Sequence, residues 1–142
     1  MVNRLVWKFT NDRPIYLQIL EQIQEGIVSG EYPIGSSIPS VRVMASDAKV
    51  NPNTMQRALQ ELESQGLLYT QRTTGRTVTE DGKMIEKIKI SLAETHIDAF
   101  FAGMKSLGIE KDEAIEMLCS GMAETPPKGA DRVDLLVDGE VN

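Results

Sequence analysis

Residues 37–66 restrict the fold of this chain more than any other stretch. Within them, apolar residues recur twice at the spacing i, i+3, i+4 and i+7. The first set is Val41, Met44, Ala45 and Ala48, and the second is Met55, Ala58, Leu59 and Leu62. Each set forms one apolar stripe along a helix. Two short helices that must bury such stripes in a common core predict a helix-turn-helix.

The ends of the second helix are marked by residues with suitable capping chemistry. Asn51 is able to accept a hydrogen bond from an unpaired N–H of the first turn. Pro52 suits the first helical position, because it has the required φ and no N–H to satisfy. Gly66 suits the left-handed conformation that commonly follows a helix end. We therefore predict a recognition helix that begins at Pro52 and stops at Gly66.

With the apolar stripe facing inward, the outer face of this helix is polar. Asn53, Gln56, Arg57 and Gln60 lie on it, and Thr54 adds a hydroxyl in the first turn. Amide, hydroxyl and guanidinium groups are the types that bind base edges and phosphates in a major groove. A solvated helix face is the alternative, and the face alone does not separate the two, because polar outer faces are the rule.

The neighbouring segments favour the nucleic-acid interpretation. Pro39 and Ser40 open the preceding helix, and Arg42 lies in its first turn. Residues 67–71 and 76–79 are typical of two short strands, joined by a turn that contains a glycine. A helix-turn-helix followed by such a hairpin is a winged helix. The predicted fold class is therefore mostly α with a small β-wing.

Residues 14–79 resemble the GntR family of bacterial transcription regulators nearly without a gap. The matching stretches are PIYLQILEQIQEGIVSGEYPIGSSIPSVRVMA and VNPNTMQRALQELESQGLLYTQRTTGRTVT. This succession of motifs is far more specific than a lone helix-turn-helix pattern, and its N-P-N-T version looks like the YtrA branch of the family. The resemblance implies a sequence-specific DNA-binding repressor whose short helical C-terminus serves dimerisation.

The resemblance also implies a set of DNA-contacting residues. In the family, the arginine of the P-S-x-R motif contacts DNA, residues around the start of the recognition helix do so too, and the wing glycine lies at the minor groove. Carried over residue by residue, the expected DNA-binding set is Pro39, Ser40, Arg42, Asn51, Asn53, Thr54, Gln56, Arg57, Thr74, Gly75 and Arg76. Many members have arginines at the positions of Pro52 and Gln56, so their base readout does not transfer.

Two further amphipathic helices, forming a C-terminal helical hairpin after the N-terminal winged helix-turn-helix, are expected beyond Asp81-Gly82. The first runs from about Met84 to Leu107, and Gly108 separates it from the second. Such helices cannot bury their apolar faces on each other alone, so they need the winged helix or a second copy. The residues expected at a dimer interface are Ile85, Ile88, Leu92, Ile97, Phe100, Phe101, Met104, Ile115 and Leu118. A two-fold homodimer would require an inverted-repeat operator on double-stranded DNA.

These features predict three parts of the chain. They are a winged helix-turn-helix DNA-binding domain over residues 1–80, a two-helix dimerisation region over 81–123, and an acidic tail over 124–142. Disorder is the default expectation for the tail. However, Val133, Leu135 and Val137 alternate, which leaves a strand docked on a partner chain open. The part after the wing is too short for the metabolite-binding domain of many relatives. A small-molecule effector bound at a dimer cleft stays open, but no residue identifies one.

The net charge of −6 at first argues against a nucleic-acid partner. Residues 1–80, however, hold eight Lys/Arg and eight Asp/Glu, so the whole excess lies in residues 81–142. DNA binding would then depend on where the cations of the neutral part are displayed, because phosphate contact and counterion release are local effects.

Composition gives no support to other classes of function. One histidine, His96, and one cysteine, Cys119, do not make a multi-histidine metal site, and no motif predicts an enzyme or a cofactor. No apolar run reaches membrane-spanning length and the N-terminus lacks a signal-peptide core, so a cytoplasmic location is expected. A protein-interaction module is the competing function, although the face over residues 51–57 lacks an apolar anchor.

Overall fold

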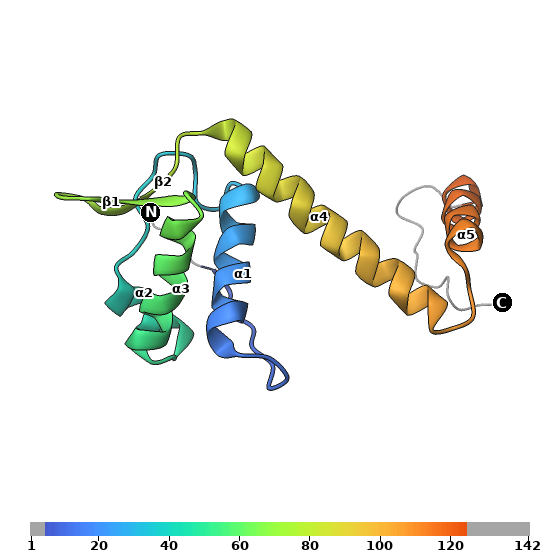
Figure 1. Cartoon of the computed structure of the whole chain (residues 1–142), viewed down its shortest axis with the longest axis horizontal. Coiled ribbons are helices and arrows are strands. Elements are labelled where there is room, and N and C mark those ends of the chain that lie inside the picture. Colours follow the sequence, from blue (N-terminus) through green and yellow to red (C-terminus); the bar gives the residue numbers. More distant parts are fainter. Residues whose placement is uncertain (1–4, 125–142) are drawn as a thin grey trace. The chain divides into compact units, whose positions relative to one another are not determined.

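The computed structural model describes residues 5–124 of the chain, which contain five helices and one two-stranded sheet (Figure 1). The elements are α1 (Ile15–Val28), α2 (Val41–Ala48), α3 (Pro52–Ser64), β1 (Leu68–Gln71), β2 (Gly75–Val78), α4 (Gly82–Lys105) and α5 (Lys111–Glu124). The chain divides into two compact units between Ala93 and Glu94, inside α4. The predicted fold class is confirmed as mostly α with a small β-wing and C-terminal helices. Residues 125–142 of the tail, which include Val133, Leu135 and Val137, lie outside the described residues.

The core of the first unit forms where α1 packs on α3 and α2 closes against α3. Ile19 and Ile23 of α1 have no exposed surface, and neither do Met55 and Leu59 of α3. Met44 contributes from α2 and is almost completely buried. The three helices therefore bury the apolar stripes that the sequence places on them, and their opposite faces stay in solvent.

Tyr32 closes one end of this core after α1. A Cβ at Gly26 would lie 3.1 Å from the Tyr32 ring and 3.1 Å from Leu5, so the close approach of these side chains depends on glycine. Burial raises the pKa of Tyr32 to about 12, and the nearby charges of Asp47 and Glu31 act in the same direction. The loop that leads from α1 to α2 is thereby anchored on the core.

Capping residues set the ends of α2 and α3. The Asn51 side chain accepts a hydrogen bond of 2.7 Å from the backbone N–H of Asn53, and Pro52 is the first residue of α3. Ser40 caps α2 in the same way, by accepting from the N–H of Val43. Lys49 ends α2 in the left-handed conformation, with φ 60°. The predicted start of the recognition helix is confirmed.

The wing is an antiparallel hairpin to which the segment before α2 adds hydrogen bonds. Leu68 of β1 pairs with Val78 of β2, and Gln71 pairs with Gly75 across the turn. The backbone N–H of Val78 donates to the Ser36 carbonyl at 2.8 Å, and the N–H of Ile38 donates to the Arg76 carbonyl at 3.0 Å. The loop that leads into α2 and the wing therefore hold each other in place.

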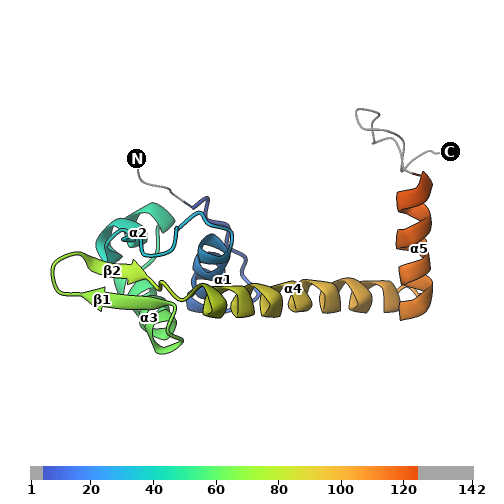
Figure 2. The same cartoon turned by 90° about the horizontal axis from the view of Figure 1, so that it is seen from above.

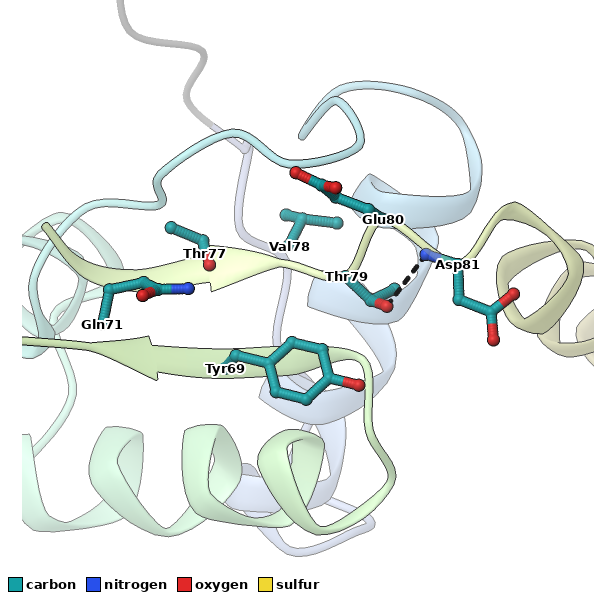
Figure 3. A pocket seen from close by; sticks show the side chains of 7 residues that line it. All are labelled: Tyr69, Gln71, Thr77, Val78, Thr79, Glu80 and Asp81. Atoms are coloured by element: carbon teal, nitrogen blue, oxygen red, sulfur yellow. Dashed lines mark hydrogen bonds between the residues drawn. The ribbon is translucent and has the colours of Figure 1, made fainter.

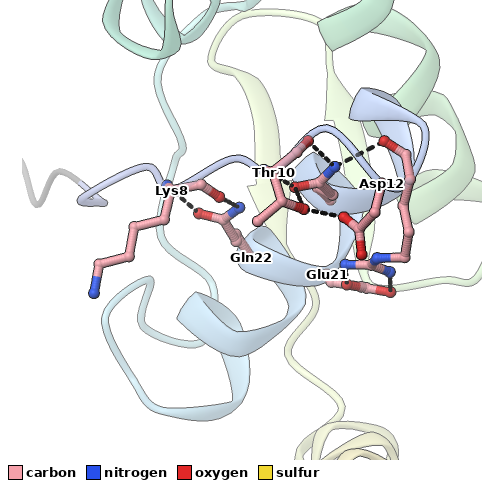
Figure 4. Close-up of polar contacts among 7 residues, drawn as sticks. Lys8, Thr10, Asp12, Glu21 and Gln22 are labelled. Atoms are coloured by element: carbon pink, nitrogen blue, oxygen red, sulfur yellow. Dashed lines mark hydrogen bonds and ion pairs between the residues drawn. The ribbon is translucent and has the colours of Figure 1, made fainter.

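An extended segment before α1 is held by two glutamines of that helix (Figure 4). Gln22 accepts from the backbone N–H of Lys8 at 3.1 Å and donates to its carbonyl at 2.7 Å. Gln18 does the same at Thr10, with distances of 2.9 and 3.0 Å. The two glutamine side chains therefore bond the backbone groups that a neighbouring strand would bond in a sheet. Leu5, Trp7 and Phe9 of this segment are half-buried against the core, whereas Val6 is exposed.

The first part of α4 belongs to the winged-helix unit. Asp81 caps this helix by accepting from two backbone N–H groups of its first turn. Ile85 is buried in the core of the first unit, and Ile88 packs partly against it. The sequence places the boundary at residue 80, whereas the first compact unit extends to Ala93. The reason is that these isoleucines complete the apolar core of the first unit.

The second unit contains the rest of α4 and α5. Gly108 has φ 84° and lies in the turn between them, and α5 runs across the end of α4 instead of returning beside it (Figure 2). Ala114 is buried, and Phe101 and Met104 are half-buried. No helix in the described part has the length and apolar character needed to cross a membrane.

Candidate nucleic-acid interface

The first two turns of α3 bring together most of the predicted base-reading residues. Asn53 and Arg57 are exposed, and Thr54 and Gln56 are partly exposed beside them. Asn51 has a structural role instead, because its side-chain oxygen accepts the hydrogen bond that caps the helix. The result is a rigid polar surface of amide, hydroxyl and guanidinium groups, which are the groups that read base edges and hold phosphates.

Arg57 does not extend freely into solvent. Its guanidinium carbon lies 3.6 Å from the centre of the Tyr16 ring, at the start of α1. The two side chains line a shallow hollow of about 400 Å³ together with Ile15, Asn53 and Thr54. In the sequence, Tyr16 shares helical spacing with Ile19, Leu20, Ile23 and Ile27, which predicts that it belongs to the apolar stripe of α1. That pattern gives no sign of the contact with Arg57. No local signal could have shown it, because the two residues meet only when α1 packs on α3.

The start of α2 carries the three residues of the P-S-x-R motif. Pro39 is half-buried, and the Ser40 hydroxyl caps the helix, so both shape the backbone. Arg42 is the second residue of α2 and is exposed. A guanidinium there offers planar donors suited to a phosphate or a guanine edge.

Of the three wing residues expected to contact DNA, two are exposed and one is held against α3. Thr74 lies in the turn, Gly75 follows with φ 77°, and both are exposed. Arg76 instead points back onto the end of α3, where its Nε lies 3.3 Å from a Glu63 carboxylate oxygen. The same carboxylate accepts a hydrogen bond from the Thr70 hydroxyl. With 16% of its side chain exposed, Arg76 joins the wing to α3, and Arg72 is the exposed cation of the wing turn.

Replacing Glu63 with glutamine is expected to lower the free energy of unfolding by about 1 kcal/mol, because the amide keeps the Thr70 contact but loses the charge opposite Arg76. Chemical denaturation followed by circular dichroism measures this. Glu61→Gln is the matched control, since Glu61 is exposed on the same helix. The control should stay within about 0.5 kcal/mol of wild type. Equal stability of the two variants would mean that the pair with Arg76 does not hold the wing.

A second hollow at the base of the wing has the wrong charge for DNA. It has a volume of about 430 Å³, and Figure 3 shows the residues that line it, Tyr69, Gln71, Thr77, Val78, Thr79, Glu80 and Asp81. The Thr79 hydroxyl accepts from the backbone N–H of Asp81 and orients the turn into α4. Two carboxylates in the lining would repel phosphate. This hollow therefore lies outside the candidate interface.

The residues predicted at a dimer interface fall into two groups. Ile85 and Ile88 pack with the winged-helix core, so the expectation that Ile85 faces a partner does not fit its burial. In the second unit, Ile97, Phe100, Ile115 and Leu118 are between 38% and 51% exposed. Phe101 and Met104 of the same unit are half-buried, and the Phe100 and Phe101 rings lie 5.3 Å apart. Leu92 is half-buried too, and it lies just before the boundary, in the first unit.

Among residues 5–121, no three histidine, cysteine, aspartate or glutamate side chains gather to hold a metal ion. A capped recognition helix, a preceding helix with an exposed arginine and a two-stranded wing together define a winged helix-turn-helix protein.

Comparison with known proteins shows to which family this chain belongs. The sequence profile of bacterial regulatory proteins, gntR family, matches residues 15–78. The uncharacterized HTH-type transcriptional regulator YhcF of Bacillus subtilis (strain 168) is 39% identical, over 77% of this chain and 90% of that protein. The HTH-type transcriptional repressor YtrA of the same organism is 38% identical, over 65% and 75%. This chain belongs to the GntR family, whose members are transcriptional regulators and not enzymes.

A solved structure supports the same assignment. The GntR family transcriptional regulator from Listeria monocytogenes superimposes with a TM-score of 0.71 and 39% identity, over 79% of this chain and 98% of that one. The similarity to it and to YhcF extends beyond the 64-residue match to the family profile, residues 15–78, and so takes in part of the region that follows the wing.

Proposed function

We propose that this chain is a transcriptional repressor that binds an inverted-repeat DNA operator as a homodimer. The observation that carries the proposal is the exposed first part of α3, where Asn53, Thr54, Gln56 and Arg57 form one rigid polar surface. The repressor assignment is supported by the similarity to YtrA, which is named a repressor.

The residues divide into those that read bases and those that hold phosphates. Asn53, Thr54 and Gln56 read base edges in the major groove, since amides and hydroxyls pair with them directly. Arg42 and Arg57 bind the backbone on either side of these residues. In the wing, Thr74 and Gly75 approach the duplex together with Arg72, because Arg76 is held by Glu63.

The dimer is supported by the apolar surface of the second unit. Ile97, Phe100 and Leu118 leave between 38% and 51% of their surface in water. Burial of apolar surface stabilises association by about 25 cal/mol per Å² before the costs of ordering are subtracted. A second copy of the same two helices offers a matching surface, and a two-fold dimer presents two recognition helices to successive turns of DNA.

The test is selection of duplexes from a random-sequence pool, followed by titration of the enriched duplex at two salt concentrations. We expect an inverted repeat whose half-site centres are about one helical turn apart, because that is the spacing of two major-groove helices. Affinity should fall by about 10³-fold or more between 50 and 200 mM salt. A random duplex of equal length is the control. No enrichment, or equal affinity for both duplexes, would contradict the proposal.

A further inference from the structure

We propose that Tyr16 is a positioning residue for DNA binding, which holds the guanidinium of Arg57 against its ring so that the edge of that group meets a backbone phosphate. The proposal rests on the DNA-binding function proposed above and adds a residue of α1 to it. It assigns the hollow between the start of α1 and the first turns of α3 to a phosphate of the duplex.

The geometry of the Tyr16–Arg57 pair shows which side of the guanidinium contacts the ring and which side stays available for hydrogen bonds. A distance of 3.6 Å from the guanidinium carbon to the ring centre is van der Waals contact over the face of Tyr16. The N–H donors of a guanidinium lie in its plane. A face stacked on a ring therefore leaves the donors at the edges of the group available. A phosphate with two oxygens in that plane would receive two parallel hydrogen bonds.

The surroundings of the pair suit an anion. The hollow is lined by Ile15, Tyr16, Asn53, Thr54 and Arg57, so its only charged side chain is the arginine. Neither α1 nor α3 has an acidic residue in its first turn. Both helices begin at this hollow, and the positive ends of their dipoles favour negative charge nearby. The hollow at the wing base, with Glu80 and Asp81, is of the opposite kind.

The advantage of the stack is preorganisation. An unsupported arginine on a helix surface samples many rotamers, and this freedom is lost when the side chain binds a phosphate. Tyr16 is half-buried between α1 and α3, so its ring is a fixed surface on which Arg57 already lies. The Arg57 side chain is therefore already ordered before DNA binds. Loss of the ring should weaken DNA binding about 2-fold to 5-fold, the range that follows from an exposed cation–π contact.

The experiment is a double-mutant cycle read out on two duplexes. Tyr16→Leu, Arg57→Ala and the double variant are titrated with the duplex that the wild type selects and with a random duplex of equal length. We expect Tyr16→Leu to weaken binding to both by the same factor, because phosphates carry no sequence information. In the Arg57→Ala background, Tyr16→Leu should have no further effect. A full effect of Tyr16→Leu in that background would overturn the proposal.

Tyr16→Phe is the matched variant, because it keeps the ring and removes only the hydroxyl. It should bind like wild type, and a loss equal to that of Tyr16→Leu would overturn the positioning role in favour of direct contact by the hydroxyl. The Arg57 Nε–H resonance gives a readout without DNA. It should shift on Tyr16→Leu and not on Tyr16→Phe, since an aromatic ring current shifts the resonances of nuclei held close over the ring face and phenylalanine keeps that ring. No shift in either variant would overturn the stack.

The outcomes separate this proposal from the proposed function. If the wild type binds no duplex, both are overturned. If the wild type binds and Arg57→Ala weakens binding while Tyr16→Leu does not, the role of Tyr16 alone is overturned. Thermal unfolding of each variant shows whether a loss of binding reflects a loss of folding.

Discussion

Replacing Arg42 with alanine is expected to lower the affinity for the operator about 10-fold to 150-fold and to leave the winged helix folded. The expected range corresponds to the roughly 1.5 to 3 kcal/mol that a charge-assisted contact contributes. Arg42 is exposed at the start of α2, and the hydrogen bond that caps this helix comes from Ser40. The substitution therefore removes a donor group without opening the core. Titration with the selected duplex and thermal unfolding measure the two effects.

Lys87→Ala is the control for the loss of one positive charge. Lys87 is exposed on α4, which begins near the C-terminal end of α1, whereas α3 begins near its other end (Figure 1). This variant should keep wild-type affinity to within about 2-fold, since a distant charge is screened beyond roughly 8 to 10 Å. Unchanged affinity of Arg42→Ala would remove Arg42 from the interface. An equal loss in both variants would mean that only the overall charge matters.

If the proposed homodimer forms through the second unit, replacing Ile97 with aspartate is expected to convert it to a monomer and to lower operator affinity on the order of 100-fold or more. Ile97 is 51% exposed on the part of α4 that belongs to the second unit. A carboxylate at an apolar interface would have to be buried without a partner, which is costly. Two linked winged helices bind two half-sites with an avidity gain of about 10²-fold to 10⁴-fold, and a monomer loses it. Sedimentation at micromolar concentration and titration measure the two results.

Leu107→Asp is the control for this substitution. Leu107 is 72% exposed in the turn after α4 and is not among the residues expected at the interface. It should leave the dimer and the operator affinity unchanged. A wild-type monomer at micromolar concentration would contradict the dimer directly. A dimer that survives Ile97→Asp would show that the two copies meet through another surface.

The winged helix could be predicted because its signals are local. Asn51 and Pro52 mark the start of α3 through their own side-chain chemistry, and the apolar stripe on α3 follows from helical spacing alone. Each of these signals spans a few residues, so packing did not have to be known. The predicted strands differ from β1 and β2 by one residue at most at either end, a difference that hydrogen-bond definitions alone produce.

The candidate site was predicted only in part, because packing sets the direction of its side chains. Arg76 was assigned to DNA as the neighbour of the wing glycine, but the end of α3 brings Glu63 to it. Tyr16 was assigned to the apolar stripe of α1, but its ring lies under Arg57. Ile85 was assigned to a partner chain, but it completes the winged-helix core.

The sequence by itself therefore determined the helices, the caps and the wing, because capping and apolar periodicity act between residues close together in the chain. The resemblance of the motifs in residues 14–79 to the GntR family indicated the family. The tertiary structure alone decided which cations remain available to a partner. Arg42 and Arg72 are exposed, Arg57 lies stacked on Tyr16, and Arg76 is held by Glu63. The physical reason is that each of these contacts joins residues from separate elements, which meet only after α1, α3 and the wing have packed together.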